Sequence, residues 1–462
     1  MFDLEVKKIP CALTIAGSDS GGGAGIQADL KTFAALGVHG MSAITSITAQ
    51  NTVAVTAIQD VEEEVIKAQI DAVVSDIGVD AAKTGMLHTK NIIHCISKEI
   101  EEHGFPLVVD PVMVAKSGAL LLKPEAIHSL INELLPLATV VTPNIMEAEK
   151  LSSIKINSTE SMRECAKAIS RLGPKAVVIK GGHIPIGKKV IDVLYYNGEF
   201  KTFEAEYIET KTTHGTGCSF SAAIAAGIAK GKEIPEAVEL AKKFITQSIK
   251  HGIKIGKGHG PVNPMAMLFN ECKKYYVLKN IKEAIKAIEQ NPFFSSIIPE
   301  SQSNIVMALP YAFDKTHVAG IPGRIVKVGN FAKASSCPEF GASHHVASAV
   351  LVAMKYDPSI RAGLNIKYSE ELLEICKKMG LTISFYDRKL EPFEIKKVEG
   401  MSIKWGIEEA IKKIGKVPNI VYHTGDWGKE PMIVILGKTA LEVSEVAIKI
   451  AEEYVKRNKG KT

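Results

Sequence analysis

One short segment of the sequence combines the residue types that bind phosphate. It runs from Thr213 to Cys218 with the sequence Thr-His-Gly-Thr-Gly-Cys, and small residues follow it. This pattern predicts the start of a helix, where the first amides have no partner within the helix and carry about half a positive charge. Gly215 and Gly217 let the backbone approach a ligand, and Thr216 adds a hydroxyl. The segment therefore predicts a site for a phosphate or a developing oxyanion.

Cys218 closes this segment with a thiol. At a helix start we expect the pKa of a thiol to be lowered, and Cys218 would then accept a proton from a substrate hydroxyl or position that hydroxyl. The alternative is a structural cysteine in a buried helix start, because free cysteine is often a small core residue. Both interpretations stay open on these residues alone.

A second glycine-rich segment lies far from the first in the sequence. An apolar run from Leu13 leads into the stretch Gly17–Gly25, which feeds a predicted helix. The stretch lacks the glycine and lysine order of a P-loop, and its glycine spacing differs from the dinucleotide-binding fingerprint. Two such loops are expected to form opposite walls of one site.

The elements that must position these loops follow a regular alternation. Apolar runs at 11–16, 43–48, 82–84, 107–110, 139–142 and 176–180 alternate with amphipathic segments near 25–36, 62–75 and 90–103. Because the runs are apolar on both faces, they predict a mostly parallel sheet covered by helices, with ligands beyond the carboxyl ends of its strands. Asp110, Asn144 and Lys180 each come at such an end. Turn capping explains any one of them equally well, but three at one edge favour a site.

Composition is typical of a large enzyme without a charged macromolecular partner. The chain has 462 residues, too many for one ordinary core, so we expect two or more domains. Its 56 basic and 51 acidic residues give a net charge of +5, too weak to indicate nucleic acid or a membrane surface. The seven cysteines show no C-x-x-C spacing, which favours a reducing compartment. The sequence shows neither an apolar secretion signal nor a membrane span, so we expect a cytoplasmic location.

Residues 10 to about 268 resemble the hydroxymethylpyrimidine and hydroxymethylpyrimidine-phosphate kinases of thiamine biosynthesis, which have the ribokinase-like fold. The turn at 213–218 belongs to the match. The other matching segments are Ala16–Asp29, Thr48–Thr52, Val109–Met113 with Ala115–Gly118, Thr142–Asn144 with Glu147–Ala148, and Lys180–His183.

This resemblance implies an ATP-dependent kinase that uses Mg²⁺, and phosphoryl transfer depends mainly on alignment and charge neutralisation. Lys180 and Cys218 are the expected catalytic residues of this half. The expected phosphate-binding residues are Asn144, Gly215, Thr216 and Gly217. The expected metal ligands are Asp110 and Glu147.

The resemblance also implies which residues hold the pyrimidine. They are Gly17, Asp29, Gln50 and Met86. The amide of Gln50 suits an aminopyrimidine edge because it offers both a donor and an acceptor. Asp29 has an alternative role as the acidic partner of its helix dipole.

The rest of the chain predicts a second, smaller α/β domain. Its strands are expected at 305–309, 323–328, 362–366, 381–386, 420–423 and 432–436, with helices at 279–290, 345–355, 369–379, 403–414 and 441–456. We place the boundary near 268–278, which gives a kinase domain at 1–270 and a second domain at 278–462.

Three glycine-marked segments of this half offer donors to an anion. They are Ile321–Arg324, Phe340–His345 and Gly425–Pro431. A phosphate or pyrophosphate ligand is the natural expectation. A histidine pair at a helix start is nevertheless more often a cap or a solvated surface than a catalytic pair.

Residues 280–458 resemble the thiamine-phosphate synthase domain that is fused behind this kinase in archaea and some bacteria. The matching segments are 321–326, 339–347 and 428–432. The functional arginine and histidine of that family map onto Arg324 and His345. His344 is the weaker candidate, because His345 is the one followed by Val-Ala as in the pattern. Lys429 is expected to bind pyrophosphate beside them.

Together the resemblances imply a bifunctional enzyme, which phosphorylates hydroxymethylpyrimidine twice and couples the pyrophosphate to hydroxyethylthiazole phosphate. The partners are then small molecules, and a homo-oligomer is expected. One alternative is a C-terminal half that only senses a ligand, against which the presence of Arg324 and His345 counts. Another is pyridoxine as the kinase substrate, because pyridoxal kinases share the fold and the thiol, although the segment Ala49–Thr52 favours the pyrimidine.

Overall fold

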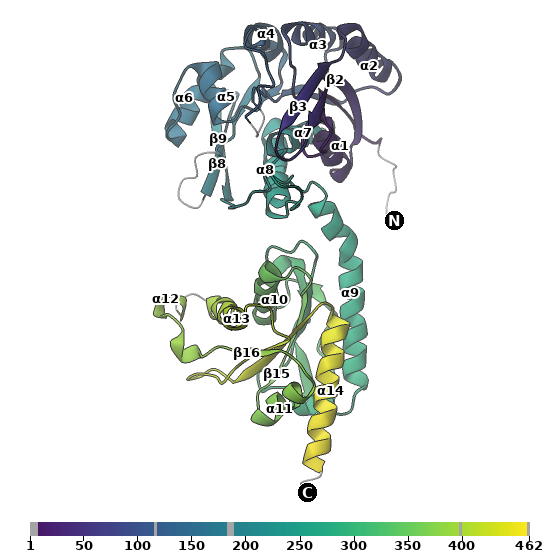
Figure 1. Ribbon diagram of the computed structural model, residues 1–462. Helices are drawn as coiled ribbons and strands as arrows, with labels where there is room; N and C mark the ends of the chain where they lie inside the picture. The colour runs from purple at the N-terminus through teal and green to yellow at the C-terminus, as the bar shows by residue number, and fades with distance from the viewer. Residues whose placement is uncertain (1–7, 115–117, 183–188, 397–399, 460–462) are drawn as a thin grey trace. The chain divides into compact units, whose positions relative to one another are not determined.

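The chain folds into two compact units, Met1–Leu268 and Phe269–Thr462. This computed structural model describes residues 8–114, 118–182, 189–396 and 400–459 (Figure 1). The motif residues Ala115–Ser117 and His183 lie outside the described residues. Each unit is an α/β structure with its own hydrophobic core.

The N-terminal unit is built on one mixed sheet in the strand order β3-β2-β1-β4-β5-β6-β7-β8-β9. The strands from β2 to β7 in this order are parallel, as the sequence predicts. They are β1 (Cys11–Asp19), β2 (His39–Gln50), β4 (Ala81–Thr84), β5 (Leu107–Val109), β6 (Val140–Val141) and β7 (Ala176–Ile179).

Antiparallel strands complete both edges of this sheet and were not predicted. They are β3 (Val55–Asp60), β8 (Lys189–Tyr196) and β9 (Glu199–Glu206). The two edge strands β3 and β9 carry few buried residues, and β9 with the sequence EFKTFEAE is mostly exposed. An apolar run therefore does not reveal them.

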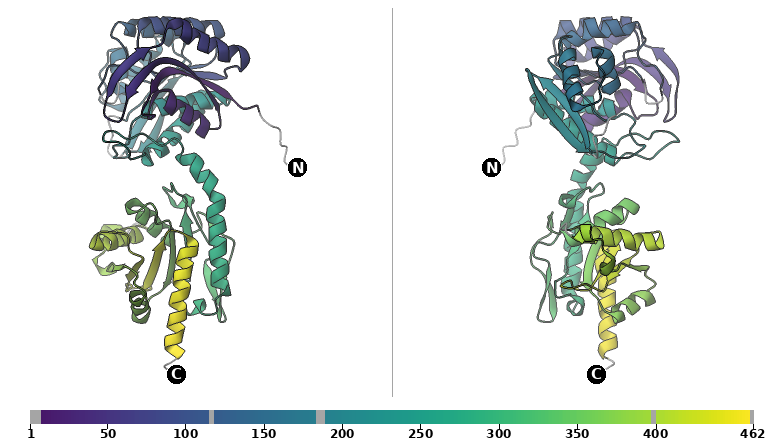
Figure 2. Two further views of the ribbon diagram at one scale, coloured as in Figure 1. Left: turned by 45° about the vertical axis from the view of Figure 1, so that its right-hand side comes forward. Right: turned by 90° about the vertical axis from the view of Figure 1, so that its left-hand side faces the viewer.

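Helices cover both faces of the sheet (Figure 2). One face packs against α1 (Gly25–Ala35), α7 (Thr216–Ala229) and α8 (Ile234–Lys250). The other packs against α2 (Glu63–Asp76), α3 (Lys90–His103), α4 (Ala126–Ser129), α5 (Ile145–Ser152) and α6 (Thr159–Ser170). Helix α7 is buried over most of its length, and its run of alanine and serine lets it approach the sheet closely.

The C-terminal unit has a mostly antiparallel sheet in the order β14-β11-β10-β15-β18-β17-β16. The pair β16–β17 is parallel. The strands are β10 (Ile305–Ala308), β11 (Val318–Gly320), β14 (Glu339–Phe340), β15 (Ala362–Lys367), β16 (Ile383–Phe385), β17 (Ile420–His423) and β18 (Met432–Gly437). A separate hairpin joins β12 (Ile325–Val328) to β13 (Phe331–Ala334).

Helices also sandwich this second sheet (Figure 1). One face packs against α9 (Ala266–Gln290), α11 (Glu370–Lys378) and α14 (Ala440–Lys459). The other packs against α10 (His345–Tyr356) and α13 (Met401–Ile414), and a short α12 (Phe393–Lys396) precedes α13. Within the described ranges, no helix is long and apolar enough to cross a membrane.

A buried ion pair fixes the backbone that follows β7. Lys242 of α8 contacts Asp192 of β8 at 2.8 Å, and the side chains are 8% and 6% exposed. The other carboxylate oxygen of Asp192 accepts a hydrogen bond from the Gly181 amide at 2.9 Å. The pair therefore holds the segment that begins at Lys180.

We expect Asp192→Ala to lower the free energy of unfolding of this unit by about 3–5 kcal/mol, because it leaves a buried ammonium without a partner. Hydrogen exchange of peptides from this unit in increasing urea measures the change. The control is Glu204→Ala, which breaks the exposed pair with Lys189 on the same hairpin and should change little. Equal losses in the two variants would contradict the assignment.

Candidate active site

The two glycine-rich loops of the N-terminal unit are in backbone contact. Gly215, which precedes α7, has a φ of +78°, and a Cβ atom there would lie 1.8 Å from the carbonyl oxygen of Gly23. Gly25 is similarly constrained, since its Cβ would lie 2.4 Å from the carbonyl oxygen of Gly17. Only glycine fits both positions, so Gly215 sets the distance between the loops and Gly25 sets the path of the first loop.

Asp19 organises the first loop. Its carboxylate accepts hydrogen bonds from the amides of Gly21 at 2.8 Å, Gly23 at 3.0 Å and Ala24 at 2.8 Å. It also lies 2.9 Å from Nε2 of His214. Burial alone raises the pKa of Asp19, but these hydrogen bonds outweigh burial and bring the pKa below its ordinary value. Neither Asp19 nor His214 was predicted as a site residue, although an aspartate before a glycine run is typical of a side-chain-capped turn.

The start of α7 presents free amides beside a buried ion pair. The amides of Gly217 and Cys218 have no backbone acceptor in the described part of the chain. Lys180 contacts Asp110 at 2.9 Å, and a Cβ atom on Gly217 would lie 3.3 Å from the Lys180 ammonium. Asp110 also accepts a hydrogen bond from Ser221 of α7 at 3.3 Å. The free amides at the start of α7 therefore lie close to the Lys180 ammonium and the Asp110 carboxylate.

Lys180 keeps its charge at this point. Burial alone lowers the pKa of Lys180, but the carboxylates of Asp110 and Glu147 raise it above its ordinary value. A permanent cation beside free amides is the arrangement that binds phosphate oxygens.

Asn144 and Glu147 form a reciprocal cap at the start of α5. The Glu147 amide donates to the Asn144 side chain at 3.0 Å, and the Asn144 amide donates to the Glu147 carboxylate at 2.8 Å. Burial raises the pKa of Glu147, Lys180 lowers it, and the nearby Asp110 raises it further. The cap keeps the Glu147 side chain in the neighbourhood of Lys180 and Asp110.

A second buried ion pair lies near Cys218. Lys83 contacts Asp29 at 2.8 Å with both side chains 0% exposed, and Thr14 donates to the same carboxylate oxygen at 2.7 Å. Burial lowers the pKa of Lys83, but the carboxylates of Asp29 and Asp110 help to raise it above its ordinary value on balance. Lys83 was not predicted as a site residue. A lysine inside a buried strand was the available signal, because it needs a carboxylate partner.

The expectation of a lowered pKa for Cys218 is wrong. Burial raises the pKa of the Cys218 thiol to about 11, the ammonium of Lys83 opposes this, and the carboxylates of Asp29 and Asp110 add to it. Desolvation and two nearby anions therefore outweigh the helix start. In the free protein Cys218 is a neutral thiol at neutral pH.

The predicted pyrimidine-binding residues lie around the same loops. A Cβ atom on Gly17 would lie 3.1 Å from the sulfur of Met86. The Gln50 side-chain amide lies 3.3 Å from Nε2 of His214. Asp29 is fully buried, and its Oδ1 atom has no hydrogen-bond partner among the described residues.

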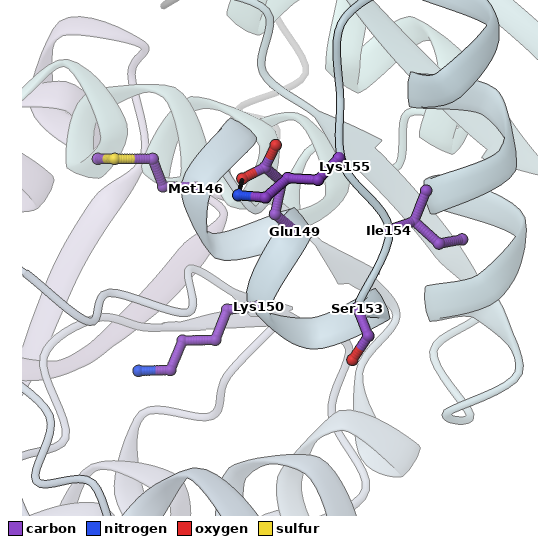
Figure 3. Close-up of a pocket in the computed structure, with 6 residues that line it drawn as sticks. All are labelled: Met146, Glu149, Lys150, Ser153, Ile154 and Lys155. Atoms are coloured by element: carbon purple, nitrogen blue, oxygen red, sulfur yellow. Dashed lines mark hydrogen bonds and ion pairs between the residues drawn. The ribbon is translucent and has the colours of Figure 1, made fainter.

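A surface hollow beside α5 lies apart from these residues. Figure 3 shows its lining, in which Lys155 pairs with Glu149 at 2.9 Å. The hollow has a volume of about 290 Å³ and is lined by Met146, Glu149, Lys150, Ser153, Ile154 and Lys155. None of these is a predicted site residue.

In the C-terminal unit, Arg324 is held in an unusual backbone conformation. Its φ is +70°, and it follows Gly323 with a φ of +69°. The guanidinium donates a hydrogen bond to the carbonyl oxygen of Ser301. Glu430 accepts hydrogen bonds from the amides of Ser301 at 2.9 Å and Glu300 at 2.7 Å. These bonds tie Arg324 to the segment that carries Lys429.

The predicted residues of this unit gather at the start of α10. Burial lowers the pKa of His345, and the charges of Arg324, Lys315, His344 and Lys429 lower it further. We call the cations Lys315, Arg324 and Lys429, together with the neutral His345 on which they act, the cation cluster. Lys315 was not predicted, because nothing in its local sequence distinguishes it from a surface lysine. The cluster can bind an anionic group such as pyrophosphate.

Comparison with known proteins decides the family. Residues 19–263 match the family described as phosphomethylpyrimidine kinase. The chain belongs to this family. Residues 280–449 match the family described as thiamine-phosphate synthase ThiN. The chain therefore joins a kinase unit to a unit that matches the thiamine-phosphate synthase family of thiamine biosynthesis, as the sequence predicts.

Two relatives illustrate the match of the kinase unit. The hydroxymethylpyrimidine/phosphomethylpyrimidine kinase of Bacillus subtilis is 46% identical over 260 residues, which cover 56% of this chain and 96% of that protein. The thiamine biosynthesis bifunctional protein ThiED of Geobacter sulfurreducens is 50% identical over 252 residues, which cover 54% of this chain and 51% of that protein.

Solved structures share the fold of the kinase unit. An ADP complex of Bacillus subtilis pyridoxal kinase has a TM-score of 0.53 and 44% identity, and the match covers 56% of this chain and 99% of that chain. Staphylococcus aureus pyridoxal kinase with AMP-PCP and pyridoxal has a TM-score of 0.52 and 40% identity, covering 56% and 94%. The predicted ribokinase-like fold is thereby confirmed.

We expect Gly215→Ala to destabilise the kinase unit by about 1–3 kcal/mol more than Gly231→Ala, because it forces the Gly23 carbonyl to move. Gly231 is the matched control, since its φ is +75° and nothing lies within 4 Å of an added Cβ atom. Both variants carry the backbone strain, so the difference in free energy of unfolding measures the loop contact. Equal losses would show that the contact is dispensable.

The Asp19 carboxylate also predicts a pH dependence. Because its pKa is lower in the folded protein, its stabilisation is complete above the ordinary value of 3.8 and is lost as the pH falls through the folded value. The difference in free energy of unfolding between the wild type and Asp19→Asn should therefore be constant near neutral pH and shrink below about pH 4. A constant difference down to pH 2 would contradict this.

Proposed function

We propose that the kinase unit transfers phosphate from ATP to hydroxymethylpyrimidine and then to its monophosphate. The proposed synthase reaction of the second unit joins the resulting pyrophosphate to hydroxyethylthiazole phosphate. The observation that carries the first step is the meeting of the free Gly217 and Cys218 amides with the Lys180–Asp110 pair. The ADP and AMP-PCP complexes of the similar pyridoxal kinases support ATP as the phosphate donor.

The donor set fits a magnesium ion. Asp110 and Glu147 offer carboxylate oxygens, and Asp110 raises the pKa of Glu147, so the two anions lie close together. A divalent cation would relieve this repulsion and, when bound, would neutralise charge on the transferring phosphoryl group. We assign Asp110 and Glu147 as its ligands, with Asn144 orienting Glu147 through the cap.

Phosphoryl transfer needs alignment and fixed positive charge. Lys180 and the amides of Gly217 and Cys218 supply the charge at the phosphoryl oxygens. Cys218 enters the reaction as a neutral thiol, so we assign it to hold the attacking hydroxyl by a hydrogen bond. Gly17, Gln50 and Met86 hold the pyrimidine, and Asp29 offers its unpartnered oxygen to it.

The coupling reaction breaks the bond between the pyrimidine methylene carbon and pyrophosphate, and forms a bond from that carbon to the thiazole nitrogen. Negative charge collects on the leaving pyrophosphate, so cations placed there lower the barrier. Arg324 can bind it through two parallel hydrogen bonds, and Lys429 and Lys315 add point charges. His345 has a lowered pKa and is therefore neutral at neutral pH, which suits it to orient the thiazole phosphate.

The decisive experiment incubates the full chain with hydroxymethylpyrimidine, ATP, Mg²⁺ and hydroxyethylthiazole phosphate, and measures thiamine phosphate. We expect Arg324→Ala to reduce coupling by about 10²–10³-fold and to accumulate the pyrimidine pyrophosphate. We expect Cys218→Ala to slow the kinase steps while leaving coupling of supplied pyrophosphate unchanged. The control for Arg324→Ala is Lys327→Ala, which removes an exposed positive charge. The control for Cys218→Ala is Cys272→Ala, which removes an exposed thiol.

Two results would overturn parts of this proposal. If the wild type accumulates the pyrimidine pyrophosphate without consuming the thiazole phosphate, the second unit only binds a ligand. If pyridoxal is phosphorylated faster than hydroxymethylpyrimidine, the kinase substrate is a pyridine, as in the similar pyridoxal kinases.

A further inference from the structure

The synthase unit contains a group of buried polar side chains outside the cation cluster. They gather near the carboxyl ends of β16 and β17. We call them the buried polar cluster; its members and exposed fractions are Tyr386 at 4%, Arg388 at 9%, Glu391 at 7% and His423 at 5%. Polar groups this deeply buried normally have hydrogen-bond partners.

One atom of the cluster lacks such a partner. Within the described ranges, the Oε1 atom of Glu391 is buried without a hydrogen-bond partner. Burying a polar atom without a hydrogen bond is unfavourable. Such atoms are expected where a ligand supplies the missing partner.

His423 and Tyr386 add two neutral donors. The Nδ1 atom of His423 accepts a hydrogen bond from the Gly425 amide at 3.2 Å, which places the ring proton on Nε2. Burial and the charge of Arg388 lower the pKa of His423 to about 4, so the ring is neutral. Burial raises the pKa of Tyr386, so its phenol keeps its proton. The two rings lie 5.1 Å apart.

The Tyr386 ring is held firmly in place. Trp405 contacts it edge-on with centroids 6.1 Å apart. A Cβ atom on Gly406 would lie 2.4 Å from the Tyr386 ring, so α13 packs directly against it. The cluster therefore has one fixed aromatic face.

One loop connects the buried polar cluster to the cation cluster. It joins β17 to β18 and spans residues 424–431. Near its start, the Gly425 amide donates a hydrogen bond to Nδ1 of His423. Its end carries Lys429, whose charge lowers the pKa of His345. Glu430 follows, and its carboxylate accepts a hydrogen bond from the Ser301 amide. The same loop therefore carries a hydrogen-bond donor to the buried polar cluster and a lysine of the cation cluster.

We propose that the buried polar cluster binds the aminopyrimidine ring of the pyrophosphate substrate while the cation cluster binds the pyrophosphate. The inference rests on the synthase function proposed above. Arg388 and Glu391 cancel in charge, which favours a neutral ring over a phosphate. An aminopyrimidine carries an amino donor beside a ring-nitrogen acceptor, which matches a carboxylate acceptor and a guanidinium donor.

Steady-state coupling by the full chain tests the proposal, with pyrimidine pyrophosphate supplied and ATP omitted. We expect Glu391→Gln to raise the KM for the pyrimidine pyrophosphate at least tenfold and to leave the KM for thiazole phosphate within twofold. Tyr386→Phe is a second, nearly isosteric variant with the same selective increase. The matched control is Glu394→Gln, an exposed carboxylate close in sequence, which should change neither value.

Inhibition by inorganic pyrophosphate separates the two parts of the substrate. Its inhibition constant should be unchanged in Glu391→Gln and raised in Arg324→Ala. The proposal is overturned if the cluster variants leave the KM for the pyrimidine pyrophosphate unchanged, raise both KM values equally, or weaken inhibition by pyrophosphate. If the wild type couples normally and the variants give any of these three results, only this inference is overturned and the synthase function stands. A wild type without coupling would overturn the synthase function and this inference together.

Discussion

In the kinase unit, the backbone of one glycine-rich loop packs directly against the backbone of another. The carbonyl oxygen of Gly23 occupies the space in which any side chain at residue 215 would begin. This contact fixes where α7 starts, and so where its free amides point. Lys180, Asp110 and Cys218 take their places relative to that helix start. The site therefore depends on backbone packing before it depends on any catalytic side chain.

Buried ion pairs then set the charge of the kinase site. Lys180 with Asp110, and Lys83 with Asp29, each place a permanent cation near the carboxyl end of a parallel strand, β7 and β4 respectively. The same carboxylates, together with burial, keep Cys218 protonated. Fixed positive charge and a neutral thiol suit a reaction in which phosphate oxygens must be neutralised and aligned, with little covalent work left to the protein.

The synthase unit divides its chemistry differently. Its cations are gathered around the start of α10, whereas a charge-balanced set of polar groups is buried near the ends of β16 and β17. The loop 424–431 links the two sets, because the Gly425 amide donates a hydrogen bond to His423 and Lys429 belongs to the cation cluster. A substrate with an anionic end and a neutral polar ring has a complementary partner at each position.

The sequence by itself determined the elements with strong local signals. Apolar runs predicted the parallel strands, and the glycine and thiol spacing at 213–218 predicted a helix start. The edge strands β3 and β9 carry no such signal, because few of their residues are buried. The tertiary structure alone decided the partners of Asp19 and Lys83, and it reversed the expected pKa of Cys218. Pairing and pKa depend on burial and on charges brought from distant strands, which no local pattern contains.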